Sequence, residues 1–408
     1  MGYAPPVAAQ FGDGPNIDAF SRLRVSDPVA LFSTQCQYNA SGLQMETGAT
    51  GTGSAGSHSA NTRMVALACT AGTGTSFIQS YEYIPYQPGK SQLILMTGVL
   101  GAGVASTTVD VGAFDVANGI FLRQNGASGL QLVRRSSTSG SVVNEVVPQS
   151  EWNCDRLDGN GPSDVLFDET KAFIFAIDAQ FLGMGRVRAY FDIGGMLIQV
   201  HEFRCANVLA VPYMQSLSLP VQMLVTAAGG AKTAHFKCAS VSSEGGFSED
   251  AGFSFATPSV GTTAASGAAT AMLSIRPGTT FNSLANRQRM RFDSVEILSG
   301  LNPVRWELVL GATFSGAPTF AAVNATYSGT EYTSAPGTWA TSPLIIAAGY
   351  MPGSATARGT VSAATKVKYP LTLDRAGSQR ALGTLTLVCT GIGGTSACSV
   401  SMNFTEVR

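Results

Sequence analysis

Charged residues are scarce in this sequence: they make up 12% of its 408 positions, about half the usual share. The 25 lysines and arginines balance 26 aspartates and glutamates, so the formal net charge is −1 at pH 7. Nucleic acids and anionic membranes attract proteins through a basic field, which this chain lacks. The composition therefore gives no support to a nucleic-acid partner.

Long apolar segments and paired cysteine motifs are also missing. The chain holds no run of about 18 apolar residues, and its opening MGYAPPVAAQFGDG has neither a basic start nor an apolar core. We therefore expect no secretory signal and no membrane insertion. The seven cysteines form no CxxC motif, which predicts reduced and mostly buried thiols in a protein made in a cytoplasm. A disulfide between Cys389 and Cys398 across adjacent strands is the alternative.

Glycine is abundant, with 46 residues, and it accompanies many serines, threonines, alanines and valines. This composition is typical of a β protein with many tight turns. Apolar and polar residues alternate along several segments, so that Val187, Ala189 and Phe191 would share a buried face. Short turns are predicted at Asn118-Gly119, Asn125-Gly126 and Gly194-Gly195.

These patterns predict an all-β chain with two antiparallel, jelly-roll-like β-sandwiches and an extended N-terminal arm. The arm is assigned to residues 1–52, the first sandwich to 53–246 and the second to 247–408. The second boundary lies where hydrophobic residues thin out and small residues take over, between Ser243 and Thr270.

The arm contains the segment NIDAFSRLRV, in which Phe20, Leu23 and Val25 need an apolar surface to cover them. Arg22 and Arg24 can bridge to carboxylates or backbone carbonyls along such a surface. We therefore predict that these five residues form an interface with another subunit. The alternative is an ordinary edge strand and loop of the first domain.

Catalytic motifs are weak in this sequence. Of the three histidines, His58 lies in a Gly/Ser-rich stretch and His235 reads as a strand residue. His201 stands beside Glu202 and four positions before Cys205, but neighbours on a strand point to opposite faces. We therefore predict a non-enzymatic protein. Asp178 and Asp192 are the one carboxylate pair that suggests glycoside cleavage, as in a polysaccharide depolymerase.

An acidic loop, CDRLDGNGPSDVLFDET, raises the alternative of a structural calcium ion. Its acidic residues are Asp155, Asp158, Asp164 and Asp168. The order of ligands in an EF-hand is not met, however, and Asp or Asn beside Gly commonly forms turns. We predict no bound metal and no cofactor.

Aromatic residues gather in YEYIPYQPGK, which places Tyr81, Tyr83 and Tyr86 close together. Exposed tyrosines offer stacking faces for sugars or partner proteins. Alternatively, the tyrosines flank an edge strand whose pairing the prolines prevent. Both interpretations stay open, and the three tyrosines are candidate glycan or partner contacts.

Several ordered segments resemble virion structural proteins of tailed double-stranded DNA bacteriophages. They include IDAFSRLRVSDPVALF, YIPYQPGKSQLILMTGVLG, VGAFDVANGIFLRQNG, EWNCDRLDGNGPS and FLGMGRVRAYFDIGGMLIQVHEFRCANV, between about Asn16 and Gly246. The resemblance implies a component of the particle, assembled in the bacterial cytoplasm. It carries no catalytic residue over to this chain.

The sequence thus predicts a virion protein of the tail, collar or fibre that forms a homo-oligomer and contacts other virion proteins. Two alternatives remain: a capsid decoration protein, and an adhesin that binds a host surface glycan. The adhesin gains some support because FDVANGIFLRQNG also looks like the strands of a lectin-type jelly roll.

Overall fold

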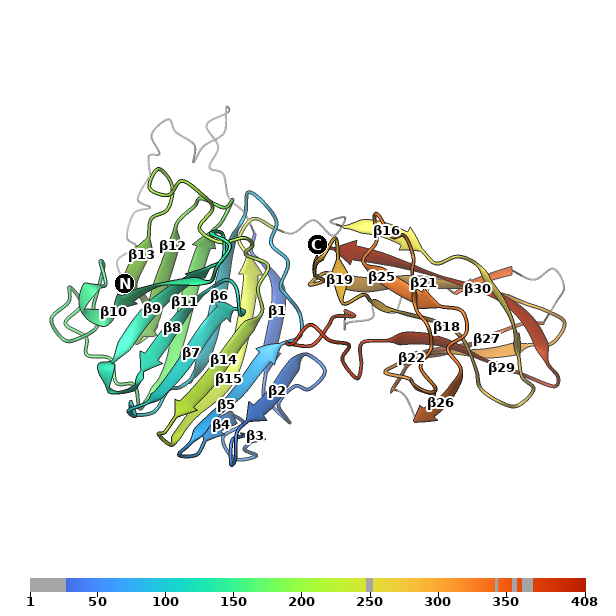
Figure 1. Cartoon of the computed structure of the whole chain (residues 1–408), viewed down its shortest axis with the longest axis horizontal. Helices are drawn as coiled ribbons and strands as arrows, with labels where there is room; N and C mark the ends of the chain where they lie inside the picture. Colours follow the sequence, from blue (N-terminus) through green and yellow to red (C-terminus); the bar gives the residue numbers. More distant parts are fainter. Residues whose placement is uncertain (1–26, 247–251, 342–343, 354–357, 362–369) are drawn as a thin grey trace, which may run out of the picture.

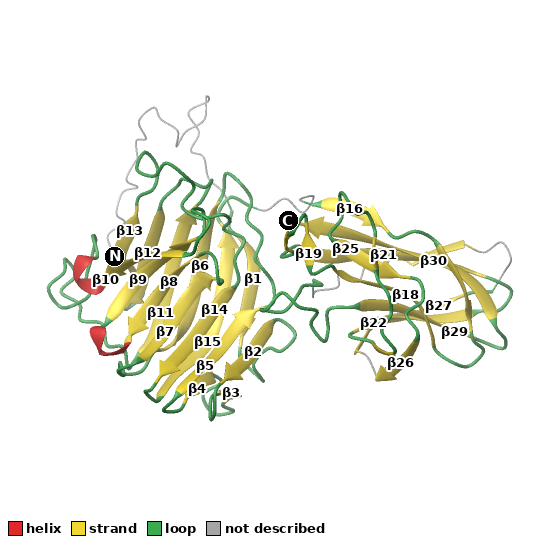
Figure 2. Cartoon of the chain, viewed as in Figure 1, coloured by secondary structure: helices red, strands yellow, loops and turns green. Residues whose placement is uncertain are grey.

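The computed structural model describes residues 27–246, 252–341, 344–353, 358–361 and 370–408. Two antiparallel β-sandwiches lie side by side, the first in blue to yellow-green and the second in yellow to red (Figure 1). Apart from strands, the described residues form only two short 3-10 turns, Gly126–Ser128 and Gln149–Glu151 (Figure 2). The predicted all-β fold with sandwich-like sheets is confirmed.

The first sandwich pairs an eight-stranded sheet with a seven-stranded sheet. The eight-stranded sheet runs in the order β13 (Met196–Phe203), β12 (Val187–Ile193), β11 (Ala172–Gln180), β6 (Ser91–Val99), β15 (Lys232–Ser243), β4 (Val65–Cys69), β3 (Ala55–His58), and β1 (Val29–Gln35) also pairs with β15. The seven-stranded sheet runs in the order β10 (Val143–Pro148), β9 (Leu130–Ser136), β8 (Gly119–Asn125), β7 (Thr107–Phe114), β14 (Val221–Ala228), β5 (Thr73–Ser80), β2 (Met45–Thr50).

The core of the first sandwich follows from alternation along its strands. Every second residue of β6 is buried, which places Ile94 and Met96 in the core between the two sheets. On β12, Val187, Ala189 and Phe191 are at most 1% exposed, as their spacing predicts. The intervening residues of β12, Arg188, Tyr190 and Asp192, therefore lie on the outer face of the eight-stranded sheet, where a surface site can form.

The N-terminal part of the first sandwich differs from the prediction. Residues 29–50, assigned to an arm of residues 1–52, include β1 and β2, which pair with β15 and β5. Phe32, Cys36 and Met45 are buried in the sandwich core because they lie on or next to these strands. The predicted arm is therefore too long, and its interface residues Phe20, Arg22, Leu23, Arg24 and Val25 lie outside the described residues.

The second sandwich pairs a five-stranded sheet with a six-stranded sheet. In the five-stranded sheet, the order is β16 (Phe253–Ala256), β30 (Ser396–Val407), β21 (Arg289–Ser299), β28 (Arg358–Val361), and β17 (Val260–Ala264) also pairs with β30. In the six-stranded sheet, the order is β24 (Ala321–Ala322), β25 (Thr330–Thr333), β18 (Thr270–Pro277), β29 (Leu385–Gly391), β22 (Val304–Leu310), β27 (Leu344–Met351). Two small hairpins complete it: β19 (Thr280–Phe281) with β20 (Leu284–Ala285), and β23 (Thr313–Ser315) with β26 (Thr338–Thr341).

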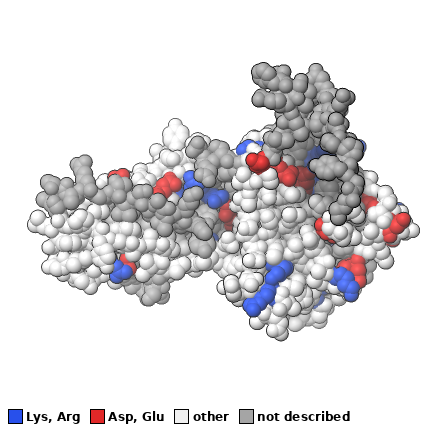
Figure 3. All heavy atoms as spheres, turned by 180° about the vertical axis from the view of Figure 1, so that it is seen from behind, with Lys and Arg blue, Asp and Glu red and all other residues white. Residues whose placement is uncertain are grey.

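The two sandwiches have separate apolar cores. Phe292 and Phe404 from one sheet of the second sandwich meet Leu308 and Leu387 from the other. Charged side chains are few and scattered on the face shown in Figure 3. In the part of the chain that the structure describes, no helix is long and apolar enough to cross a membrane.

Candidate functional site

The two sandwiches meet at a joint of arginines and aromatic rings. Arg380 of the second sandwich lies over the ring of Tyr81, with its guanidinium carbon 3.8 Å from the ring centre. Arg287 lies over Tyr83 at 4.6 Å. Tyr83 is only 7% exposed, and burial raises the pKa of both tyrosines while the arginines oppose this shift. Cation–π contacts are stronger at buried rings such as Tyr83 than at half-buried rings such as Tyr81.

A second row of contacts runs through Arg375. Its guanidinium lies 4.4 Å from the ring centre of Phe77, and its Nε donates to Gln79 Oε1 at 3.1 Å. Its backbone N–H donates to Glu46 Oε2 at 2.8 Å. These three partners belong to β5 and β2, so Arg375 holds the second sandwich against one end of the seven-stranded sheet.

Two carboxylates sit among these contacts. Arg289 Nη1 lies 2.9 Å from Glu82 Oε1, and Glu82 is 8% exposed. Burial raises the pKa of Glu82 and Glu46, whereas Arg289 and Arg375 act in the opposite direction. Because a buried carboxylate without a partner is costly, removal of the Arg289 side chain should destabilise the joint by leaving Glu82 unpaired.

Two of the three tyrosines that the sequence suggests as glycan or partner contacts lie in the joint. Tyr81 and Tyr83 contact arginines of the same chain, whereas Tyr86 lies apart from the joint. Sequence reasoning missed the four arginines: Arg287, Arg289, Arg375, Arg380. A signal was present, because NRQRMRF and DRAGSQR concentrate arginine in a sequence with little charge.

Tyr86 borders a polar groove of about 310 Å³ on the outer face of the eight-stranded sheet. The groove is lined by Tyr86, Gly89, Lys90, Ser91, Asp178, Gln180, Leu182, Arg186, Arg188 and Glu244. Strands β6, β11 and β12 supply Ser91, Asp178, Gln180 and Arg188, and the adjoining loops supply the other lining residues. The lining mixes carboxylates, cations, amide and hydroxyl groups beside one aromatic ring.

Hydrogen bonds hold the groove in shape. Arg188 forms an ion pair with Asp178, its partner on the neighbouring strand. Lys90 Nζ donates to Gly246 O at 3.1 Å, and the Tyr86 hydroxyl accepts from Leu182 N at 3.0 Å. The Tyr86 ring also meets Phe181 edge-on, with the ring centres 5.2 Å apart. Rigid polar groups and a fixed ring suit the binding of a polyhydroxylated ligand.

The carboxylates Asp178 and Asp192 do not come together as a catalytic pair. Asp178 lies opposite Arg188, and Asp192 follows Arg188 by four residues on β12. Four residues of a strand span about 13 Å. Paired glycosidase carboxylates lie about 5 to 9.5 Å apart. Asp192 instead borders a separate hollow with Thr97 and Lys237.

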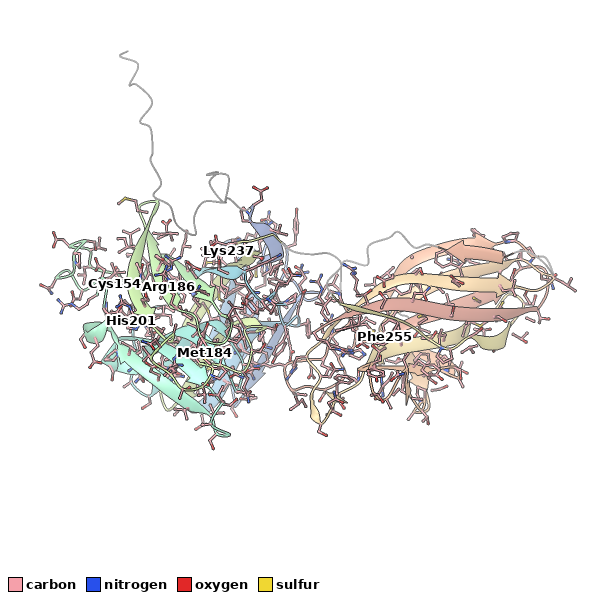
Figure 4. The ribbon with its side chains drawn as sticks, turned by 90° about the horizontal axis from the view of Figure 1, so that it is seen from above. Cys154, Met184, Arg186, His201, Lys237 and Phe255 are labelled. Atoms are coloured by element: carbon pink, nitrogen blue, oxygen red, sulfur yellow. The ribbon has the colours of Figure 1, made fainter. Side chains whose placement is uncertain are left out.

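His201 and Cys205 are packed into the first sandwich rather than presented to solvent. His201 Nδ1 accepts a hydrogen bond from Asn153 N at 3.3 Å, and burial lowers the pKa of this histidine. Burial raises the pKa of the Cys205 thiol, the opposite of what a nucleophilic cysteine needs. Figure 4 labels His201 near Cys154 and Arg186. The next residue, Glu202, forms an ion pair with Arg186 at 3.6 Å.

The acidic loop uses its carboxylates to fix turns. Asp155 accepts from Leu157 N at 2.9 Å and from Ser163 N at 2.8 Å. Burial alone would raise the pKa of Asp155, but these hydrogen bonds hold it below its usual value. Among the described residues, no three His, Cys, Asp or Glu side chains come close enough to hold a metal ion.

No family model and no curated protein matches this chain. Solved structures that resemble it include phage-derived proteins. A carbohydrate esterase from the Shiga toxin-encoding bacteriophage phi24B is 12% identical, with a TM-score of 0.31, over 53% of this chain and 100% of its own. The CBM2 module of the evolved Dit of Lactobacillus casei BL23 phage J-1 is 7% identical, with a TM-score of 0.33, over 55% of this chain and 100% of its own. A glycosyl hydrolase family 16 protein from Mycobacterium smegmatis is 10% identical, with a TM-score of 0.37, over 52% of this chain and 100% of its own. These sequence identities and TM-scores are too low for a function to be inferred from the similarity.

Proposed function

We propose that the protein is a non-enzymatic structural subunit of a tailed-bacteriophage virion, placed in the tail, collar or fibre. The observation that carries the proposal is the joint, because Arg287, Arg289, Arg375 and Arg380 hold two sandwiches in one orientation. A building block that sets the spacing of its neighbours needs such rigidity. The resemblance of residues 16–246 to virion proteins supports the link to phage.

In this proposal the chain assembles in the bacterial cytoplasm with copies of itself and with other virion proteins. Two loops of the first sandwich offer a contact surface. Leu182 is 61% exposed in one loop, Val208 69% and Val211 52% in the other. Tyr213 N donates to Gly183 O at 2.9 Å, which ties the loops together. Exposed apolar residues on a fixed scaffold are typical of protein contacts.

The mass of the protein in solution tests the proposal. We compare the full chain with one that begins at Asp27, which keeps every described strand because β1 begins at Val29. A discrete oligomer that dissociates on truncation supports assembly through Phe20, Leu23 and Val25. A full chain that stays monomeric and does not enter particles with other virion proteins contradicts the proposal.

The groove beside Tyr86 favours a second candidate function, an adhesin that binds a host surface glycan. Asp178 and Arg188 are held by their ion pair with oxygen and nitrogen atoms in fixed positions. Such groups bind sugar hydroxyls in defined directions, and the tyrosine ring offers an apolar surface for a sugar face. The neutral balance of charges in the whole chain suits an uncharged glycan.

A glycan array with three proteins tests this candidate. The unaltered chain should bind a defined set of glycans, and Asp178→Asn should weaken that binding by about tenfold or more, equal to about 1.4 kcal/mol. Asp192→Asn is the matched control, because Asp192 lies on the same sheet face but outside the groove lining. Equal binding by all three proteins would exclude the groove as the glycan site.

A further inference from the structure

The inward-facing residues of β30 end in a carboxylate. Met402 and Phe404 of this strand are buried in the apolar core of the second sandwich, and Glu406 follows them at the same spacing of two residues. Glu406 is 0% exposed although it is acidic. Since a buried carboxylate is costly unless it is paired and hydrogen-bonded, this position needs specific partners.

Three consecutive residues of one loop supply neutral partners for this carboxylate. Ser328 Oγ and Thr330 Oγ1 donate to Glu406 Oε1 at 2.6 Å and 2.7 Å. Gly329 N donates to Glu406 Oε2 at 3.3 Å, and Asn286 Nδ2 donates to Gly329 O at 2.8 Å, which holds the loop in place. The carboxylate therefore keeps its position without help from a charged partner.

One arginine adds a charged partner and two ring contacts. Arg408 Nη2 donates to Glu406 Oε2 and to Tyr327 O. The guanidinium carbon of Arg408 lies 4.4 Å from the ring centre of Phe281 and 5.2 Å from that of Phe253. These rings come from β19 and β16, which lie near the end of the chain marked C in Figure 1. We call the four residues around Arg408 the guanidinium cage.

The guanidinium cage opens to solvent on the side of its arginine. The Arg408 side chain is 29% exposed, whereas that of Glu406 is 0% exposed. Phe253, at one wall of the cage, is 59% exposed. Arg408 therefore covers the carboxylate, and removal of its side chain would admit a small cation without any unfolding of β30.

We propose that the guanidinium cage is a binding site for guanidinium groups and that Arg408 is its replaceable occupant. A planar guanidinium can donate to a carboxylate and a carbonyl while its faces lie against aromatic rings. An ammonium group has no flat face to stack in this way. The inference goes beyond the proposed virion role and does not depend on it, because the whole cage belongs to the second sandwich.

The Arg408→Ala variant tests the site, with ethylguanidinium as the ligand and isothermal titration calorimetry as the measurement. We expect one saturable site in this variant and none in the unaltered chain, where Arg408 fills the cage. Ethylammonium at the same ionic strength should bind about tenfold more weakly or less, because it cannot stack flat on a ring.

Two further variants control for the cage. Glu406→Gln combined with Arg408→Ala removes the negative charge and should abolish binding of ethylguanidinium. Arg276→Ala removes an arginine that lies over Phe320 and pairs with Glu331 at 3.1 Å. The Glu331 side chain is 31% exposed, so water solvates it and this variant should not bind the ligand.

Thermal unfolding of the Arg408→Ala variant gives a second measurement. The midpoint should be lower than that of the unaltered chain and should rise when ethylguanidinium is added. If the variant does not fold alone, recovery of folded protein with ethylguanidinium supports the site. The proposal is overturned by a folded variant without saturable binding, by an unfolded variant without recovery, or by equal binding of ethylammonium.

Discussion

Removal of Arg380 should release the second sandwich from the first. The Arg380→Ala change deletes the contact with the Tyr81 ring and the hydrogen bond from Nη2 to Leu43 O, 3.2 Å long. A cation–π contact at a half-buried ring contributes about 1 kcal/mol, and a hydrogen bond from a charged donor about 1.5 to 3 kcal/mol. The sum is about 2.5 to 4 kcal/mol, which favours separated domains about seventyfold or more.

Arg276→Ala is the matched control for this change. Arg276 lies over the ring of Phe320 at 3.7 Å and pairs with Glu331 at 3.1 Å, so it makes the same kinds of contact. All three residues belong to the second sandwich. The control should therefore lower the stability of that sandwich without changing how it sits against the first.

Small-angle X-ray scattering of the two variants measures the outcome. Arg380→Ala should increase the radius of gyration and broaden the range of domain orientations, whereas Arg276→Ala should give the scattering curve of the unaltered chain. If the Arg380 variant keeps that curve as well, the joint does not depend on this arginine, and the rigidity argument for a structural subunit fails.

Two further predictions concern the first sandwich. Burial lowers the pKa of His201 below its unfolded value of about 6.5, so the unfolded chain binds more protons and stability should fall as the pH drops below about 6.5. In urea titrations from pH 7.5 to 5, His201→Gln should reduce this decline, and an unchanged slope would contradict the reasoning. Gly112→Ala should cost about 2 kcal/mol or more, because its new Cβ would lie 2.4 Å from Ile120 O. Gly261→Ala is the control, since nothing lies within 4 Å of its new Cβ. If thermal unfolding shows that the two variants lose the same stability, the predicted clash at Gly112 is refuted.

The strands of the first sandwich were predictable where turns and alternation agreed. Gly194 and Gly195 have φ values of 63° and 87°, which a two-residue hairpin between β12 and β13 requires. The alternation of Val187, Ala189 and Phe191 then fixes which face is buried. Both signals are local, so the sequence alone contains them.

The start of the sandwich was not predictable in the same way. The pairing of β1 with β15 shifts register between Ala30 and Phe32. A bulge of this kind interrupts the period of two, because an extra residue changes which side chains face the core. The sequence of this segment therefore lacks a clear strand pattern, although its buried residues belong to the sheet.

The joint could not be predicted because the residues that form its contacts are far apart in the sequence. Arg375 and Glu46 are separated by 329 positions, and Arg380 and Leu43 by 337. No periodicity links such residues. The tyrosines were recognised as a cluster, but their partners on the second sandwich could only be found in three dimensions.

The scarcity of charge and the presence of the joint have a common consequence. Arg287, Arg375 and Arg380 stack on aromatic rings inside the chain, and Arg289 pairs with a buried carboxylate. Lysine could not replace them, because only a planar guanidinium both stacks on a ring and donates sideways. Over the whole chain positive and negative charges balance, with a formal net charge of −1 at pH 7. In the homo-oligomer that we propose, copies of the chain can therefore approach one another with little electrostatic repulsion.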